Sequence, residues 1–387
     1  MLRDNEIQFI QENLHRDPVV IALEAAKFPD LNVPFLVGQI KARQKLKDKM
    51  PQWVANKSVF FPPALALEQS SSEETANFKA SLLSGKVVDL TGGMGLDSFA
   101  FAQAGCEVDY IERQEDLVKI TAFNHQVVGA GIIRHHTGDS LKWLSECREL
   151  FDFIYVDPAR RDGAGQKVVL LQNCEPNALD IIPYINDKTS LLIKTSPLLD
   201  LDRATKELDG VEKIYIVCVK NEVKELLFLK TSNSSADPSV EVIELSQANP
   251  SLFIGNKSDE SKSEITLGPV SNYLYEPHAG VLKAGFFKSV AKELQKIAHN
   301  THLYTSENLN TNFAGRTFMI LAEGTLDKKW IKSVLPGLQA NISTRNFPIK
   351  ADEIRKKFQL KDGGELTLFA FRDQANKNKV VLAKKIS

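Results

Sequence analysis

The stretch that decides the fold is Lys86–Asp97, KVVDLTGGMGLD. Its first residues are β-branched and apolar, which predicts a short buried strand. Gly92, Gly93 and Gly95 follow, and residues 98–105 (SFAFAQAG) have the pattern of a helix that ends at a glycine. A strand, a glycine-rich turn and a helix open a nucleotide-binding βα unit, because glycines let a ligand approach the backbone and the helix amides face it.

Length and composition predict a globular protein of two or three domains. The chain has 387 residues, 43% hydrophobic and 25% charged. No apolar run approaches the ~20 residues of a membrane span, so we expect no membrane partner. The four cysteines show no CxxC spacing and no nearby histidine, which argues against a metal site or a disulfide framework. A reducing, cytoplasmic compartment is the expected location.

Charge is distributed unevenly along the chain. Residues 276–387 hold 19 Lys and Arg against 10 Asp and Glu, whereas residues 1–275 hold 29 against 39. A basic C-terminal third favours a polyanionic partner, RNA above all. On charge alone, a solvated basic face without a ligand explains the same pattern equally well.

The apolar periodicity predicts an N-terminal helical segment over 1–66 and an α/β domain over 67–231. Strands alternate with helices in the α/β domain, which implies a parallel sheet covered on both faces. The last two strands are too close for a helix between them, so we expect a hairpin and one antiparallel strand. The expected strands are 86–90, 106–112, 131–139, 151–158, 189–196, 212–219 and 222–230, with helices at 116–128, 141–150, 177–185 and 202–208.

Beyond this domain, the sequence predicts a linker with connecting strands over 232–271 and a compact α+β domain over 272–387. The linker contains two Ser/Asn-rich stretches, 232–239 and 256–263, that are typical of surface loops. In the last domain we expect an amphipathic helix at the end of 273–298, followed by two strands, a helix and two more strands.

Acidic residues end the first three strands. They are Asp89, Glu112 and Asp139, and Glu112 lies 23 residues after Asp89, where an acid can accept both hydroxyls of a ribose. Singly, such acids are more often helix caps or solvated residues, but next to a glycine turn they favour a ligand crevice. The pattern Gly93-x-Gly95-x-x-Ser98 lacks the third Gly or Ala of a dinucleotide fingerprint, and no Gly-Lys-Ser/Thr follows for a P-loop.

A seven-stranded sheet with a closing hairpin resembles the Rossmann-like fold of class I S-adenosylmethionine-dependent methyltransferases, over about residues 67–230. The resemblance implies S-adenosyl-L-methionine as cofactor. Its amino-acid part would contact the glycine turn with Thr91 or Asp97, Asp89 would face its ammonium, and Asp139 would read its adenine. The implied cofactor-binding residues are Asp89, Thr91, Gly92, Gly93, Gly95, Asp97, Glu112, Asp139 and Ser140.

The same resemblance places the end of the fourth strand beside the transferred methyl group. There the sequence is Asp157-Pro158-Ala159-Arg160-Arg161. Arg160 stands where amino-methylating enzymes of this fold carry an aromatic residue, which argues against adenine or cytosine N-methylation. The pattern is closer to the Asp-Pro-Pro-Arg of RNA 5-methyluridine enzymes, but the cysteine nucleophile those enzymes need is absent after the fifth strand.

Methyl transfer depends mainly on in-line positioning and needs a general base only for a hydroxyl or a charged amine. Asp157 is the candidate base, and Lys194 would orient the substrate or hold Asp157. Arg160 and Arg161 could clamp a substrate phosphate or pair with neighbouring acids. Upstream, Gln69, Ser71 and Thr75 belong to a helix start that could also contact the ligand; helix capping explains them as well.

Six stretches in order resemble a bacterial family that carries a class I methyltransferase domain followed by a THUMP-like domain, over about residues 60–385. The stretches are EQSSSEETANFK, DLTGGMGLDSFAFA, YVDPARRD, IKTSPLLD, YLYEPHAGVLKAGFF and STRNFPIKADEIRKKF. THUMP domains hold the acceptor end of tRNA in tRNA-modifying enzymes, so the resemblance implies RNA, tRNA first, as partner. The implied phosphate contacts are Arg345, Lys350, Arg355, Lys356 and Lys357; a charged helix packed on a sheet is the alternative.

The sequence therefore favours an S-adenosylmethionine-dependent methyltransferase that acts on RNA. A non-catalytic RNA-binding protein on a methyltransferase scaffold is the second hypothesis. A methyltransferase for a protein or a small molecule is the third.

Overall fold

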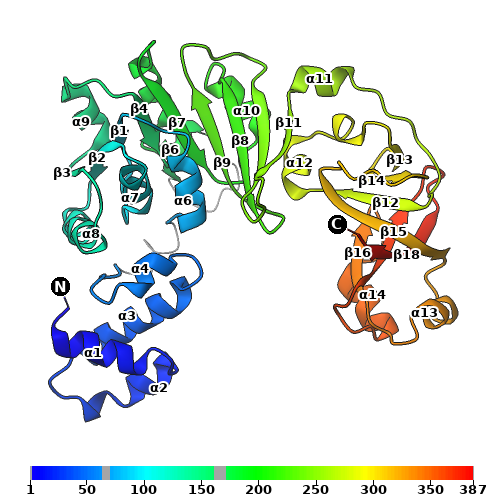
Figure 1. The fold of residues 1–387 in the computed structure, drawn as a ribbon, viewed down its shortest axis with the longest axis horizontal. Helices are drawn as coiled ribbons and strands as arrows, with labels where there is room; N and C mark the ends of the chain where they lie inside the picture. Colours follow the sequence, from blue (N-terminus) through cyan, green and yellow to red (C-terminus); the bar gives the residue numbers. More distant parts are fainter. Residues whose placement is uncertain (1, 63–69, 161–170, 387) are drawn as a thin grey trace. The chain divides into compact units, whose positions relative to one another are not determined.

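The computed structural model describes residues 2–62, 70–160 and 171–386, with the backbone alone at Arg160. The chain forms two compact units, coloured along the sequence in Figure 1. The first comprises Met1–Ile214 and Glu225–Ala236, and the second comprises Tyr215–Lys224 and Asp237–Ser387. The units therefore divide inside a β-hairpin rather than at residue 231, because the tip of that hairpin belongs with the second unit.

Residues 4–55 form the expected helical segment. Its core consists of apolar residues at helical spacing, among them Phe9, Ile21 and Ile40. The helices are α1 (Asp4–Asn13), α2 (Pro18–Leu23), η1 (Ala25–Lys27), α3 (Val33–Leu46) and α4 (Pro51–Ala55). The segment is attached to helix α8 (Glu115–Val128) of the same unit, since the side chain of Asn124 accepts from the amide of Phe60 at 2.9 Å and donates to its carbonyl at 2.8 Å.

All seven strands expected for the α/β domain are present in the large sheet. They are β1 (Lys86–Asp89), β2 (Glu107–Glu112), β3 (Ile133–Thr137), β4 (Phe153–Val156), β7 (Ser190–Thr195), β8 (Lys213–Val219) and β9 (Glu222–Lys230). The pairs that join β3, β2, β1, β4 and β7 are parallel, and β9 lies antiparallel to β7, as the hairpin predicts.

The expected count of seven strands is wrong, because the sheet has nine. Its order is β11-β10-β8-β9-β7-β4-β1-β2-β3. The added strands, β10 (Ser239–Glu244) and β11 (Ser251–Gly255), come from the stretch expected to be a linker with connecting strands. Val240, Val242 and Ile243 bury their side chains, which gives β10 enough apolar surface to join the sheet.

Helices connect the parallel strands, with two departures from the expected bounds. They are α6 (Glu73–Ala80), α7 (Leu96–Gln103), α8, α9 (Ser140–Glu146), η3 (Ala178–Tyr184) and α10 (Leu201–Glu207). Helix α9 ends before Cys147, whose backbone is extended, and so falls short of the expected end at 150. The segment 177–185 forms a 3₁₀ helix that contains Pro183, since proline cannot donate the amide that an α-helix needs. A short ribbon, β5 (Ala159–Arg160) with β6 (Cys174–Glu175), and the turn η2 (Leu171–Asn173) complete this unit.

The second unit is α+β, as expected, and carries a seven-stranded sheet of order β13-β14-β12-β15-β18-β17-β16. Alternate residues of β17 and β18 face opposite sides. Leu368 and Leu382 pack with the helices α13 and α14, whereas Phe369 and Val381 pack with Phe318 on the other face. The strands are β12 (Tyr273–Pro277), β13 (Gln295–Ala298), β14 (Thr301–Ser306), β15 (Gly315–Gly324), β16 (Asn341–Arg345), β17 (Leu366–Arg372) and β18 (Asn378–Lys385); the two helices are α13 (Lys328–Val334) and α14 (Ala351–Phe358).

Two local expectations in this unit are wrong. The helix expected at the end of 273–298 is replaced by α12 (Ala279–Ala284), the turn η4 (Ser289–Ala291) and strand β13. Gly285 and Glu293 have positive φ values of 76° and 67°, which interrupt a helix, and β13 hydrogen-bonds to β14. Residues 256–263, expected to be a loop, contain α11 (Lys257–Lys262). Among the described residues, no helix is long and apolar enough to cross a membrane.

Arg43 provides a test of how the helical segment is held together. Its side chain is buried, lies over the ring of Phe61, and donates to the carbonyls of Lys57 and Val59 at 2.9 and 2.7 Å. Burial lowers its pKa to about 10. We expect Arg43→Ala to lower the free energy of unfolding by about 2–4 kcal/mol, because it leaves two carbonyls unsatisfied and opens a cavity.

Urea unfolding followed by circular dichroism measures this change. Lys41→Ala is the matched control, since Lys41 is exposed on the same helix and carries the same charge; it should change stability by no more than about 0.5 kcal/mol. Equal effects of the two substitutions would contradict a structural role for Arg43.

Candidate active site

Asp89 hydrogen-bonds to both ends of the glycine loop between β1 and α7. This residue ends β1 and is 1% exposed. One carboxylate oxygen accepts from the amide of Thr91 at 3.0 Å, and the other accepts from the hydroxyl of Ser98 on α7 at 2.6 Å. Burial raises the pKa of Asp89 to about 7, although both hydrogen bonds oppose the rise. Asp89 therefore shapes the loop by joining its two ends.

Three side chains support the loop from β2 and α8. The hydroxyls of Tyr110 and Thr121 donate to the carbonyl of Gly93 at 2.6 and 3.1 Å. Nε2 of His125 lies 2.8 Å from the carbonyl of Gly95, and burial lowers the pKa of this histidine to about 4. A neutral imidazole thus donates to the loop.

The loop is packed on one side and open on the other. A Cβ atom at Gly92 would lie 2.2 Å from the ring of Tyr110, so this side has no room. A Cβ atom at Gly93 would meet only the carbonyl of Thr91, at 3.7 Å. The backbone at Gly93 is therefore accessible to a ligand, which is the arrangement that a nucleotide-type cofactor needs.

The other two strand-end acids have different surroundings. Glu112 lies against the loop, because its two oxygens accept from the amides of Gly93 and Gln114 at 3.1 and 2.9 Å. Asp139 is exposed and caps α9 by accepting from the amide of Lys142 at 2.9 Å, while Ser140 begins that helix. Each carboxylate oxygen has two lone pairs, so both acids keep the capacity to accept from a ligand. The structure brings Glu112 to the loop and gives Asp139 a capping role.

A buried cluster of charges lies at the first turn of α7. The ammonium of Lys79, fully buried on α6, donates to Glu225 of β9 at 2.9 Å and to Ser71 at 2.9 Å. It also lies 3.2 Å from Oδ1 of Asp97. The hydroxyls of Ser71 and Tyr155 donate to the other oxygen of Asp97, at 2.9 and 2.7 Å. The cluster joins α6, α7, β4 and β9.

The electrostatics keep Asp97 ionised. Burial alone would raise the pKa of Asp97, but the charges of Lys79 and Lys194, with the two hydrogen bonds, hold it below its usual value. Burial raises the pKa of Glu225, and Lys79 opposes this rise. Among the described residues, Oδ1 of Asp97 is buried and has no hydrogen-bond partner besides its ion pair with Lys79. This oxygen therefore keeps the capacity to accept a hydrogen bond.

Asp157 and Lys194 form an ion pair at the neighbouring ends of β4 and β7. The amide of Asp157 donates to the hydroxyl of Thr91 at 2.7 Å, which connects this pair to the glycine loop. Burial alone would lower the pKa of Lys194, but Asp157, Glu225 and Asp97 raise it above its ordinary value. Lys194 is therefore charged and fixes the carboxylate, which is 30% exposed.

The structure thus brings most of the predicted site residues together and leaves others untested. Pro158 follows Asp157 and is half-buried. The side chain of Arg160 and the whole of Arg161 lie outside the described residues, as does Gln69. Thr75 forms a capping box with Ser72, which matches the structural alternative for that segment.

Sequence reasoning missed the residues that support the site. These are Lys79, Tyr110, His125, Tyr155 and Glu225. Glu225 left a readable signal, since it is an acid directly before the apolar run 226–229 of a predicted strand. Such a residue has to be paired if the strand is buried. The tyrosines and the histidine left none, because their hydrogen bonds depend on tertiary packing.

The predicted basic residues of the C-terminal domain do not form one cluster. Arg345 on β16 is paired with the buried Glu276. Arg355 on α14 is paired with Asp352 and Asp362 at 2.7 and 2.6 Å. The others are Lys350, which precedes α14, and Lys356 and Lys357 in its last turn, all exposed. Their contacts with RNA stay predictions.

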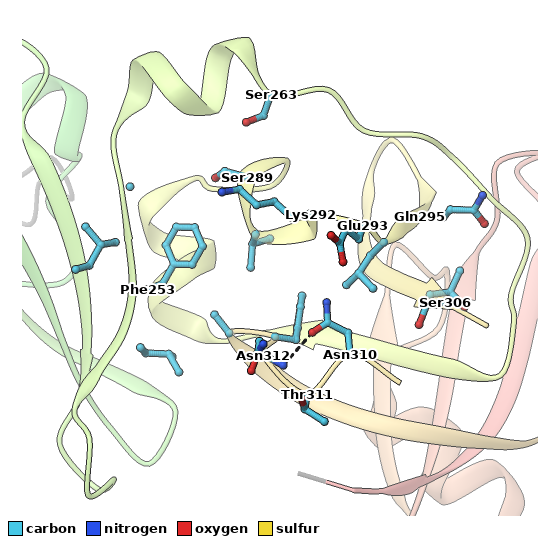
Figure 2. Close-up of a pocket in the computed structure, with 18 of the residues that line it drawn as sticks. Phe253, Ser263, Ser289, Lys292, Glu293, Gln295, Ser306, Asn310, Thr311 and Asn312 are labelled. Atoms are coloured by element: carbon cyan, nitrogen blue, oxygen red, sulfur yellow. Dashed lines mark hydrogen bonds between the residues drawn. The ribbon is translucent and has the colours of Figure 1, made fainter. Parts of the chain in front are cut away.

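A cavity of about 1150 Å³ lies in the second unit and contains none of the residues predicted from the sequence (Figure 2). Its described lining includes two lysines, Lys262 and Lys292, and three acids, Asp259, Glu293 and Glu307. The other lining residues are uncharged and include apolar ones such as Phe253 and polar ones such as Asn310 and Asn312, which are joined by the hydrogen bond drawn in Figure 2. The balance of charge does not favour an anion there.

Five neighbouring parallel strands followed by the antiparallel strand β9, an open glycine loop and acids at the strand ends define a class I methyltransferase domain. The comparisons with known proteins agree. Residues 71–164 match a family described as "Putative SAM-dependent methyltransferase", residues 273–313 a "ferredoxin-like domain" and residues 315–385 a "THUMP domain-like" family.

One solved structure matches the whole chain. It is described as a "putative methyltransferase" from Porphyromonas gingivalis, is 32% identical, covers 100% of both chains and has a TM-score of 0.86. Two proteins called "Ribosomal RNA small subunit methyltransferase J" match in part. The one from Shewanella sediminis is 24% identical over 208 residues, 50% of this chain and 73% of its own length. The one from Shewanella denitrificans is 26% identical over 148 residues, 35% of this chain and 59% of its own.

The chain belongs to the family of S-adenosylmethionine-dependent methyltransferases that carry a C-terminal THUMP-like domain. This confirms the predicted family, the fold class, the enzyme class and S-adenosyl-L-methionine as cofactor.

A pair of glycine substitutions tests the close packing beneath the loop. A Cβ atom at Gly95 would lie 2.4 Å from Thr121 and 2.5 Å from His125, and the φ of Gly95 is 78°. Gly105 has a similar φ of 93° but open space around it. We expect Gly95→Ala to weaken S-adenosylmethionine binding at least about tenfold, because it displaces the loop, whereas Gly105→Ala adds only backbone strain.

Isothermal titration calorimetry with S-adenosylmethionine measures both variants. Gly105→Ala should bind like the wild type, although it is less stable by about 1 kcal/mol. Unchanged affinity in Gly95→Ala would show that the support from Thr121 and His125 does not position the cofactor loop.

Proposed function

We propose that the protein transfers the methyl group of S-adenosylmethionine to RNA. The observation that carries the methyl-transfer site is the link from the open glycine loop, through Thr91, to the Asp157–Lys194 pair. This link puts the open side of the loop beside a partly exposed carboxylate. RNA as substrate is supported by the partial matches to ribosomal RNA methyltransferases, by the THUMP-like domain and by the basic C-terminal third.

The proposed cofactor contacts are the open side of the loop and the acids that keep free lone pairs. The amides of the glycine turn already donate within the protein, so the amino-acid part would pack against the open side of the turn at Gly93, and Oδ1 of Asp97 would accept from its ammonium. Glu112 would accept from the ribose hydroxyls, and Asp139 with Ser140 would face the adenine. Bound S-adenosylmethionine supplies a methyl group that its sulfonium already activates.

Asp157 would act mainly by orientation. A carboxylate held in place by a charged lysine and partly exposed presents lone pairs that accept hydrogen bonds. It would therefore align an amine or a hydroxyl of the substrate for in-line attack. Lys194 is a positioning residue, because it holds Asp157.

The finer choice of RNA rests on two different observations. The THUMP-like domain favours transfer RNA, which is the substrate we propose to test first. The similarity of the methyltransferase half to small-subunit ribosomal RNA methyltransferases makes ribosomal RNA the second candidate.

A methyl-transfer assay with labelled S-adenosylmethionine tests this proposal on total tRNA and on small-subunit rRNA from cells that lack the protein. We expect transfer to one RNA class. Asp157→Ala should lower kcat about 100-fold, because the substrate group loses its orienting acceptor, while the Kd for the cofactor stays within about threefold.

Asp187→Ala, which removes an exposed carboxylate, is the control and should keep full activity. Full activity in Asp157→Ala would remove this residue from the mechanism. Cofactor binding without transfer to either RNA would overturn the RNA substrate and favour a protein or a small molecule.

Asp89 gives an independent test through proton release. In the free protein its pKa is about 7, so at pH 6 it is mostly protonated. A cationic ammonium near Asp89 favours the ionised form and lowers this pKa. At pH 6 the cofactor's amino group is protonated both free and bound, so we expect wild-type binding to release up to about one proton, from Asp89, and binding to Asp89→Asn to release almost none.

Calorimetric titrations at pH 6, in buffers of different ionisation enthalpy, measure the released protons in the wild type and in Asp89→Asn. Equal release by the two proteins would show that the cofactor's ammonium does not act on Asp89.

A further inference from the structure

A smaller cavity of about 670 Å³ lies in the second unit, beside the edge strand β16. Four cationic side chains line it: Arg316 of β15, Arg345 of β16, and Lys384 and Lys385 of β18. The only acid in its described lining is Glu365, which pairs with Lys384 at 2.8 Å.

Glu276 fixes the two arginines. This carboxylate lies on β12, is 1% exposed, and gives one oxygen to Arg316 and the other to Arg345. The hydroxyl of Ser343 also donates to it, at 3.2 Å. Each guanidinium carries five N–H donors, so each keeps donors beyond those that Glu276 accepts. Both arginine side chains remain accessible, at 43% and 38% exposure.

The charges do not cancel. The four cations exceed Glu276 and Glu365 by two positive charges. The larger cavity of this unit has one more acid than it has lysines in its lining. An anion therefore finds a favourable potential in the smaller cavity and none in the larger one.

The shape of the donors selects the kind of anion. Two arginines held side by side present planar forks that match the oxygens of a phosphate. Asn341, Ser343 and Thr367 add neutral polar groups to the lining, and no side chain caps the first turn of α14, whose Ala351 lies at the cavity. A cavity of this volume accommodates one nucleotide unit of a chain.

We propose that this cavity is a docking subsite for a backbone phosphate of RNA, with Arg316 and Arg345 as the fork and Lys384 and Lys385 as flanking cations. The inference rests on the proposed function, because it assumes RNA as substrate. It also relocates the phosphate contacts expected on α14: of the five residues predicted from the sequence, Arg345 alone lines the cavity.

Two double variants of the full-length protein test whether RNA binds at this cavity or is attracted to the basic surface in general. Lys384→Ala with Lys385→Ala removes two cations from the cavity, and Lys356→Ala with Lys357→Ala removes two exposed cations from α14. The probe is a fluorescent 20-nucleotide single-stranded RNA, and anisotropy gives its Kd at several salt concentrations.

We expect the cavity variant to bind about tenfold or more weakly and the α14 variant to stay within about threefold of the wild type. The slope of log Kd against log salt should fall by about 0.7 for each phosphate that the protein no longer neutralises, in the cavity variant alone. Arg345→Gln should weaken binding to a similar extent, and its thermal unfolding shows whether it is folded.

The subsite would be overturned if the two double variants weakened RNA binding equally, or if the α14 variant weakened it more. The proposed function would not be affected by that result. A wild-type protein that neither binds the RNA in a salt-dependent way nor methylates RNA would instead overturn the proposed function. Inorganic phosphate tests whether the cavity binds a free anion instead of RNA. The cavity is not an RNA subsite if phosphate stabilises the wild type but not Arg345→Gln while the two proteins bind RNA with the same affinity.

Discussion

The ammonium of Lys79 is the interaction on which the catalytic unit depends. It is fully buried and lies between the carboxylates of Glu225 and Asp97. An isolated buried ammonium costs several kcal/mol in lost hydration, and the structure offsets this cost with two acids and the hydroxyl of Ser71. Removing Lys79 would leave both buried carboxylates without their direct ion pair, with Lys194 as the remaining nearby cation. The helix before the first strand, the helix after the glycine loop and the antiparallel strand β9 are therefore held in one arrangement.

That arrangement leaves the cofactor loop little freedom. Asp89 joins the two ends of the loop, and Tyr110, Thr121 and His125 hold its carbonyls from below. The segment that follows the N-terminal helices contributes indirectly, because the backbone of Phe60 bonds to Asn124 on the same helix as His125. A preorganised loop binds its ligand without first having to be ordered, so less of the interaction energy is lost on binding. Gly93 and Gly95 have left-handed backbones, with φ values of 52° and 78°, and side chains of β2 and α8 hold their carbonyls in place.

The sequence predicts the parts of this structure that depend on local pattern. The alternation of apolar strands and helices predicted seven strands, and the glycine turn with Glu112 predicted the loop and the acid that contacts it. Prediction from the sequence failed where pairing between distant segments decides the structure. The run that contains Val290, Leu294 and Ile297 has helical spacing, yet its end pairs with β14 because an edge position was available. The roles of Tyr110 and His125 depend on residues 15 or more positions away, which no local pattern encodes.

In the basic C-terminal domain, too, the sequence does not show which side chains pair with one another. Counting charges over 276–387 correctly indicates an excess of cations, but it cannot locate the ones that remain available. Arg355 has helical spacing and the right charge, yet Asp352 and Asp362 neutralise it. Arg345 is also paired, but its partner Glu276 is shared with Arg316, so one buried acid organises two cations and cancels only one. A shared buried carboxylate thus converts two mobile side chains into a fixed cationic surface, because each guanidinium has more donors than the acid can accept.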